Sequence, residues 1–240
     1  MDPAAIADAL RRLDAAPGPA SLRFDAPAEP LAGPLAFLPS AFNPPTIAHL
    51  SLLQRAAEAA DARPAALLST RNVEKAVTGA PLEARIEMLL LARAEGHPIA
   101  VLAANAARII DQVAALEAAF PAADPLPIVG FDTLVRLFDP RFYADITREL
   151  DPFFERRRLV AANRGHQPLE AVAEWLRRNA PEYAHRITLV ELEPEVAAVS
   201  STLARQHAAR GEPPPAVTPA IRRYLEERAL YREALAPRST

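Results

Sequence analysis

Short apolar segments alternate with amphipathic helical segments along most of this chain, and that alternation limits the folds open to it. The apolar segments have the length of buried strands. They lie at residues 35–38, 66–70, 97–103, 126–130, 158–164 and 187–192. Apolar residues at helical spacing separate several of them, at residues 46–61, 82–95 and 106–119. Strands that alternate with helices predict an α/β fold, a doubly wound (Rossmann-like) parallel sheet flanked by helices.

The expected topology also predicts where a ligand binds. In doubly wound sheets, ligands bind beyond the carboxyl ends of the strands, at the point where the strand order reverses. The segments that follow a predicted strand are residues 40–49, 69–75, 130–132, 163–165 and those after Leu192. We therefore expect the functional residues to come from these segments.

Residues 35–50 read LAFLPSAFNPPTIAHL, a predicted strand that leads through two prolines into a helix. Pro44 and Pro45 prevent regular backbone hydrogen bonding, and Thr46 can cap the helix that follows. Unpaired backbone N–H groups and the positive end of the helix dipole bind anions at such a start. His49, one turn into the helix, can add a positive or hydrogen-bonding group. The same pattern also fits an ordinary strand-to-helix turn with a buried histidine.

Two further segments that follow predicted strands carry groups suited to a nucleotide. The serine and threonine hydroxyls of residues 200–202 can open a helix with Arg205 one turn later, an arrangement that fits a polyphosphate. Gly130 permits a tight turn, and the Asp132 carboxylate can accept hydrogen bonds from ribose hydroxyls. Ordinary helix capping is the alternative interpretation of both segments.

The segment S-A-F-N-P-P-T-I-A-H at residues 40–49 resembles the G-S-F-N/D-P-x-H/T-x-G-H signature of the HIGH-type nucleotidyltransferase superfamily. The segment V-S-S-T-L-A-R-Q at residues 199–206 is similar to the I-S-S-T-x-I-R signature of the same superfamily. Within it, the chain most resembles the nicotinamide/nicotinate mononucleotide adenylyltransferases. Ser40, Thr46 and Ala48 stand where the first signature has glycine, histidine and glycine, although threonine also occurs at the position of Thr46.

The resemblance implies a nucleotidyltransferase-type domain and a role for each matching residue. In the family, the first signature holds the ATP phosphates and the second closes over ATP. The implied catalytic residues are Thr46, His49 and Arg205. The implied ATP-binding residues are Ser40, Ala41, Phe42, Asn43, Gly130, Asp132, Ser200, Ser201 and Thr202. The implied residues for the acceptor are Lys75 and Arg164.

The activity that the resemblance implies is transfer of AMP from Mg²⁺-bound ATP to nicotinamide or nicotinate mononucleotide, which forms NAD or deamido-NAD and pyrophosphate. Magnesium is then expected on phosphates and water, with little protein ligation. One alternative keeps the site but uses another phosphorylated small molecule as acceptor, with ATP or CTP as donor. Another is a non-catalytic nucleotide-binding regulatory protein, which Ser40, Ala48 and the lack of a clear stacking tryptophan motivate. Trp175 is interpreted as a core residue.

Composition limits the partners and the compartment. The chain has 240 residues and a formal net charge of −3, which predicts no broad nucleic-acid surface. It has no cysteine, which excludes disulfides and thiol catalysis. No signal peptide or membrane span is expected, and the expected location is cytoplasmic. The histidines other than His49 have no spacing that suggests a metal site.

Residues 1–34 differ from the rest of the chain. Ile6, Leu10 and Leu13 recur at helical spacing and predict a helix over residues 3–15, before a proline-rich connection over residues 16–34. We expect residues 1–34 to be an N-terminal extension and residues 35–240 to be a single nucleotidyltransferase domain. The sequence leaves the oligomeric state open.

Overall fold

A computed structural model of the protein describes residues 2–26, 28–71, 79–165 and 167–232. The first elements are α1 (Pro3–Asp14), β1 (Ser21–Arg23), β2 (Gly33–Ser40), α2 (Ile47–Ala60), β3 (Arg63–Ser69), α3 (Leu82–Ala94), β4 (Ala100–Ala104), α4 (Ile109–Ala119) and β5 (Ala123–Gly130). The later elements are α5 (Phe131–Leu137), η1 (Pro140–Phe142), α6 (Ile146–Arg156), β6 (Leu159–Ala162), α7 (Leu169–Asn179), η2 (Ala184–Arg186), β7 (Ile187–Val190), α8 (Pro194–Ala197), α9 (Ser201–Ala209) and α10 (Pro219–Glu227).

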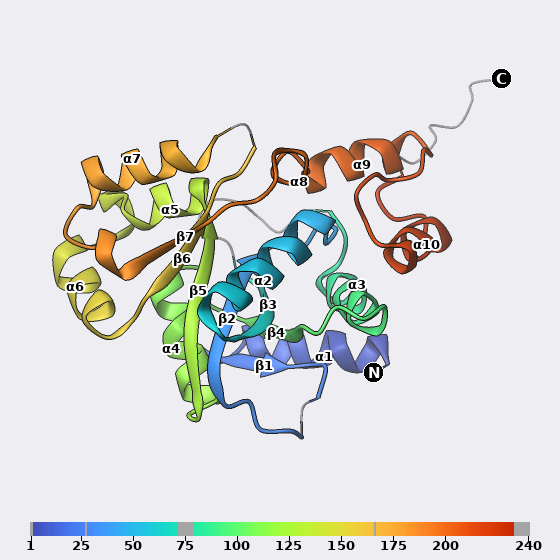
Figure 1. The fold of residues 1–240 in the computed structure, drawn as a ribbon. Helices are drawn as coiled ribbons and strands as arrows, with labels where there is room; N and C mark the ends of the chain where they lie inside the picture. Colours follow the sequence, from blue (N-terminus) through green and yellow to red (C-terminus); the bar gives the residue numbers. More distant parts are fainter. Residues whose placement is uncertain (1, 27, 72–78, 166, 233–240) are drawn as a thin grey trace.

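Seven strands in these ranges form one sheet, in the order β1-β4-β3-β2-β5-β6-β7 (Figure 1). Strands β2 to β7 are parallel, while β1 pairs with β4 in the antiparallel sense. The chain runs outward from β2 to β4, returns to β5 beside β2, and continues outward to β7. The strand order therefore reverses between β2 and β5, where ligands bind in doubly wound sheets. The predicted doubly wound α/β fold is confirmed, with one antiparallel edge strand added.

Helices cover both faces of the sheet (Figure 1). On one face, α1, α2, α3, α9 and α10 contribute buried residues to one hydrophobic cluster, and on the other α4, α5, α6 and α7 form a second cluster. Alternate residues of β2 point into the two clusters, Ala36 and Leu38 into the first and Leu35 and Phe37 into the second. A strand buried on both faces has to be apolar at every position, which explains the continuous apolar run.

The N-terminal 34 residues pack on this sheet. Helix α1 confirms the predicted helix, and its buried Ile6, Leu10 and Leu13 join the first hydrophobic cluster. The expectation of a connection over residues 16–34 is wrong in part, because β1 lies within it and pairs with β4. Three residues are too few for an alternating pattern to reveal a strand. The division into an extension and a domain of residues 35–240 stays a prediction.

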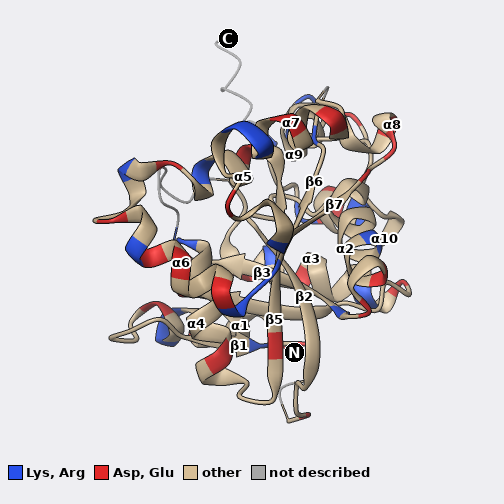
Figure 2. Cartoon of the chain, turned by 60° about the vertical axis from the view of Figure 1, so that its left-hand side comes forward, with Lys and Arg blue, Asp and Glu red and all other residues tan. Residues whose placement is uncertain are grey.

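Charged residues lie mainly on helices and loops. Figure 2 shows basic and acidic residues interspersed over these elements, while most of the sheet is uncharged. In the described part of the chain, no helix has both the length and the apolar character needed to cross a bilayer.

Candidate active site

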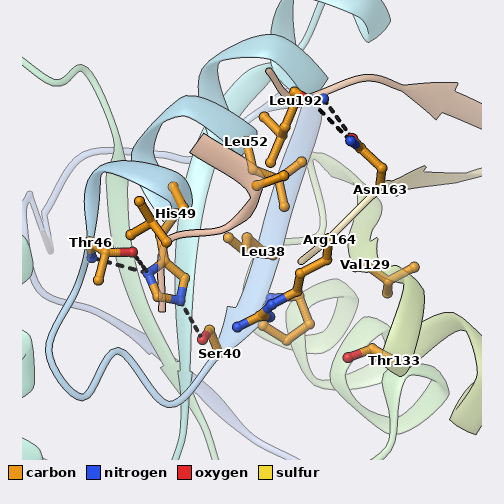
Figure 3. A pocket seen from close by; sticks show the side chains of 15 residues that line it. Leu38, Ser40, Thr46, His49, Leu52, Val129, Thr133, Asn163, Arg164 and Leu192 are labelled. Atoms are coloured by element: carbon orange, nitrogen blue, oxygen red, sulfur yellow. Dashed lines mark hydrogen bonds between the residues drawn. The ribbon is translucent and has the colours of Figure 1, made fainter. Parts of the chain in front are cut away.

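A cavity lies at the carboxyl ends of β2, β5 and β6, where the strand order reverses (Figure 3). Five of the predicted site residues line it, namely Ser40, Thr46, His49, Gly130 and Arg164. Residues 192, 197 and 199, which follow β7, complete one wall. The cavity therefore combines four of the five segments that sheet topology nominated.

His49 is buried, and both of its ring nitrogens are engaged. Nδ1 accepts a hydrogen bond from the backbone N–H of Thr46 at 3.0 Å and lies 2.8 Å from Thr46 Oγ1. A ring nitrogen that accepts from an amide carries no proton, so the proton of the neutral imidazole is on Nε2. Nε2 then donates to Ser40 Oγ, 3.1 Å away (Figure 3). His49 therefore directs one N–H donor toward the carboxyl end of β2.

Burial lowers the pKa of His49 to about 3, and the positive charge of Arg164 contributes to this shift. His49 is thus neutral near pH 7, and it supplies a hydrogen-bond donor rather than a positive charge. Arg164 supplies the charge. Its side chain extends from the end of β6 toward Ser40 and His49 (Figure 3), and it has no hydrogen bond or ion pair with any residue that the structure describes. A guanidinium in this position is suited to bind a phosphate.

The start of α2 differs from the expectation. The backbone N–H of Thr46 is bonded to the His49 ring, and the N–H of Ile47 donates to the carbonyl of Ala216 at 2.8 Å. The expectation of unpaired amides is therefore wrong at these two residues. The amide of Thr46 is bonded to a side chain three residues later. The amide of Ile47 is bonded to a loop far along the chain, and no local sequence pattern reveals that contact.

The two signature segments meet in the structure. Ser201 Oγ donates to the carbonyl of Pro44 at 2.8 Å, and Arg205 Nη1 donates to the carbonyl of Asn43 at 2.6 Å. These bonds join residues that are 157 and 162 positions apart in the chain. Arg205 does not line the cavity itself. It lies against the loop that leads to His49.

Phe42 forms the interior of that loop, while Ala41 is exposed at its start. Phe42 is fully buried, and its ring centroid lies 5.1 Å from that of His49. The carbonyl of Ala41 accepts from Nη1 of buried Arg85 at 3.1 Å, and Arg85 Nε donates to the carbonyl of Ala80 at 2.9 Å. Arg85 therefore ties the loop to the segment before α3.

The other predicted residues lie outside the lining of the cavity. Ser200 caps α9 by accepting from a backbone N–H of its first turn, and Thr202 Oγ1 accepts from Arg205. Asp132 is exposed on the first turn of α5. Lys75 lies outside the described residues. The binding roles of all four stay predictions.

Trp175 does not line the cavity. Its ring lies edge-on to Phe131 at a centroid distance of 6.0 Å and packs on Phe138 at 5.9 Å. These contacts place it against the second hydrophobic cluster. Trp175 is therefore a partly buried residue at the edge of the core, which agrees with the interpretation of a core residue in part.

Sequence reasoning missed two residues at this end of the sheet. Thr133 lines the cavity three residues after Gly130, and a spacing of three on a helix that begins at a strand end was the available signal. The hydroxyl of Tyr231 donates to Asn43 Oδ1 at 2.6 Å. Because 188 residues separate the two, no local pattern marks Tyr231.

The hydroxyls and the guanidinium that line the cavity are donors of the kind that bind phosphates. No cluster of three or more metal-ligating side chains occurs among the residues that the structure describes, and no carboxylate lines the cavity. A magnesium ion bound to a nucleotide would keep its phosphate and water ligands and would need no carboxylate from the protein.

A sequence profile of the cytidylyltransferase-like family matches residues 37–207, most of the chain. The chain belongs to this family. The match contains both signature segments, residues 40–49 and 199–206, and the resemblance to the nucleotidyltransferase superfamily is confirmed. Over 194 residues, this family member is 29% identical to a Schizosaccharomyces pombe protein named "Putative nicotinamide mononucleotide adenylyltransferase", which covers 75% of this chain and 77% of that one.

Two solved structures have a similar fold. Plasmodium falciparum nicotinic acid mononucleotide adenylyltransferase complexed with NaAD has a TM-score of 0.62 at 14% identity, over 83% of this chain and 97% of that one. The same enzyme complexed with APC has a TM-score of 0.58 at 13% identity, over 82% and 96%. At these identities the similarity establishes only the fold. This cytidylyltransferase-like chain shares the α/β fold of the two nucleotidyltransferase structures.

Proposed function

We propose that this protein is an adenylyltransferase that transfers AMP from Mg²⁺-bound ATP to nicotinamide or nicotinate mononucleotide. The observation that carries the proposal is the meeting of residues 40–49 with the start of α9, through Ser201 and Arg205, at the reversal of the sheet. The similarity to the S. pombe protein supports a pyridine mononucleotide as the acceptor. The fold shared with the Plasmodium enzyme is compatible with this acceptor.

In this reaction, an oxygen of the acceptor's 5′-phosphate attacks the α-phosphorus of ATP. The bond from the α-phosphorus to the bridging oxygen breaks, and pyrophosphate leaves with that electron pair. A phosphate monoester has a second pKa of about 6, so the acceptor is largely dianionic at neutral pH and needs no general base. The protein has to align the two phosphates and stabilise the charge that develops on their oxygens.

The residues of the site divide these tasks. We assign the charge that develops on the α-phosphate to His49, whose Nε2–H exchanges Ser40 Oγ for a phosphate oxygen. Arg205 binds the triphosphate tail with the N–H groups that Asn43 and Thr202 do not use, since a guanidinium presents several donors in one plane. Arg164 and Lys75 bind the phosphate of the acceptor.

Mass spectrometry of four incubations tests this function. The protein is mixed with magnesium and either ATP or CTP, and with either nicotinamide or nicotinate mononucleotide. We expect NAD or deamido-NAD from ATP, together with an equal amount of pyrophosphate. The CTP arm is included because the family description is cytidylyltransferase-like. A cytidine dinucleotide in place of NAD would mean that the donor is CTP. ATP binding without pyrophosphate release on any phosphorylated acceptor would contradict an enzymatic role.

A further inference from the structure

Asn43, in the loop between β2 and α2, is bonded by three segments from elsewhere in the chain. Its Oδ1 accepts from the backbone N–H of Ala80 at 3.1 Å and from the hydroxyl of Tyr231 at 2.6 Å. Its backbone carbonyl accepts from Arg205 at 2.6 Å. An amide oxygen has two lone pairs, so these two donors satisfy Oδ1 and together set the orientation of the amide. Asn43 is therefore the point at which four segments are joined.

The backbone around this point is unusual. Residues with a Cβ rarely adopt the left-handed conformation, and those that do concentrate where surrounding contacts hold them, often at functional sites. Among the described non-glycine residues, the ones with positive φ are Phe42, Asp61, Ala216, Ala229 and Tyr231. Asp61 ends α2, and Phe42 lies in the loop of residues 41–47. The other three lie in two segments that contact this loop, through the carbonyl of Ala216 and the hydroxyl of Tyr231. The loop of residues 41–47 and the turn after α10 thus both contain residues in an unfavourable backbone conformation. The contacts between the two segments hold them in it.

We propose that Tyr231 is a positioning residue of the active site. Its hydroxyl orients the amide of Asn43, and through Asn43 it keeps Arg205 where this arginine binds the triphosphate of ATP. The inference rests on the proposed function for the role of Arg205. Tyr231 lies beyond residue 207, where the match to the family profile ends.

The hydroxyl of Tyr231 stays a donor at neutral pH. Burial raises the pKa of Tyr231 above its ordinary value, while the nearby positive charges of Arg85 and Arg205 act in the opposite direction and are outweighed. Since the phenol remains protonated, the bond to Asn43 does not depend on pH in the neutral range.

Tyr224 provides a matched control in the same part of the chain. It lies on α10, seven residues before Tyr231, and its hydroxyl donates to the carboxylate of Glu87 on α3. Tyr231→Phe and Tyr224→Phe each delete one oxygen atom and one hydrogen bond from a partly buried tyrosine. Only the first deletion reaches the loop that precedes His49.

Steady-state kinetics of the two variants test the inference. Tyr231→Phe is expected to raise KM for ATP about fivefold and to lower kcat/KM for ATP about tenfold, the effect of one hydrogen bond of ordinary strength. KM for the mononucleotide should change less than twofold, and Tyr224→Phe should stay within twofold of wild type throughout. A merely structural role would lower kcat with the folded fraction and leave KM unchanged. Equal ATP kinetics in the two variants would overturn the inference.

Calorimetric titration with ATP alone separates this inference from the proposed function. If the wild-type protein releases no pyrophosphate with any mononucleotide, the proposed function is wrong. Tyr231→Phe should still bind ATP about fivefold more weakly than Tyr224→Phe, because Arg205 contacts the triphosphate before any chemistry occurs. Equal affinities of the two variants, or no ATP binding by the wild-type protein, would overturn the positioning role of Tyr231.

Discussion

His49 contributes a single, well-defined donor at the carboxyl end of β2, because the Thr46 amide fixes its proton on Nε2. Loss of one donor of the oxyanion-hole type lowers kcat by about 10² to 10³. His49→Ala is expected to show a loss of this size in pyrophosphate release, with the fold retained. His49→Gln, which keeps an amide N–H near the position of Nε2, should retain more activity.

His185→Ala is the control for this prediction, since His185 is exposed and far from α2 in the sequence. It should match wild type in both turnover and melting temperature. Wild-type turnover in His49→Ala, at an unchanged melting temperature, would refute the catalytic role of His49. An inactive His49→Ala protein that is also unfolded would instead indicate a histidine with a structural role.

The neutral state of His49 also predicts how stability depends on pH. Its pKa is about 3 in the folded protein and about 6.5 in an unfolded chain. Because the folded-state pKa is the lower one, the contribution of neutral His49 to stability is complete above pH 6.5 and is lost as the pH falls toward 3. Melting temperatures at about pH 7.5 and 4.5 should therefore fall more for wild type than for His49→Gln. Equal falls would contradict a buried, neutral histidine.

At the scale of the elements, the contact between the loop of residues 41–47 and the segment before α3 leaves no room for a side chain at Gly79. A Cβ on Gly79 would lie 2.3 Å from Asn43 Nδ2, at a φ of 92°. Gly79→Ala should lower both the stability of the protein and kcat/KM for ATP, since the Asn43 amide has to move. The cost in free energy of unfolding is expected to be about 2 to 4 kcal/mol, from overpacking together with the disfavoured φ.

Gly96→Ala separates those two causes. Gly96 has a φ of 101°, and a Cβ there would meet no atom within 4 Å. It should carry only the backbone cost, about 1 kcal/mol, and leave kinetics at the wild-type level. Urea denaturation and ATP kinetics on both variants provide the measurement. Indistinguishable results for the two glycines would mean that the packing of Asn43 on Gly79 has no effect.

The N-terminal 34 residues are joined to the sheet by the side chain of Asn105, which follows β4. Nδ2 donates to the carbonyls of Leu13 and Gly18, each at 3.0 Å, and Oδ1 accepts from the N–H of Ala20 at 2.7 Å. Asn105→Ala should lower the free energy of unfolding by about 3 kcal/mol, because buried backbone groups lose their partners. Asn179→Ala, at an exposed residue with one hydrogen bond, should cost less than about 1 kcal/mol. Similar losses of the free energy of unfolding in the two variants, measured by urea denaturation, would argue against a stabilising contact between the N-terminal 34 residues and the sheet.

At the scale of the whole molecule, the alternation of buried parallel strands with helices was the most predictable feature. The four central residues of β2 and of β3 are buried on both faces and therefore apolar, and this pattern is visible without knowledge of the partner strand. Strand β1 has three residues, one of them exposed, so it carries too little pattern to be detected. The expected strand at 97–103 begins only at Ala100, since Pro98 removes a backbone donor.

The site was predictable where residues follow a strand and hidden where distant segments meet. Ser40, His49, Gly130 and Arg164 line one cavity because parallel strands end at one edge of the sheet. The Ala216 carbonyl contacts the start of α2 because the segment between α9 and α10 passes beside it. The local spacing of residues does not encode the path of that segment. The same reason hides the bond between Tyr231 and Asn43.

Two segments more than 150 residues apart in the chain are expected to bind one triphosphate. The most direct measurement is a crystal structure of the protein with a non-hydrolysable ATP analogue. The expected result is a single bound analogue with phosphate oxygens within hydrogen-bond distance of both His49 Nε2 and the Arg205 guanidinium. An analogue whose phosphates contact only one of these residues, or neither, would contradict the account.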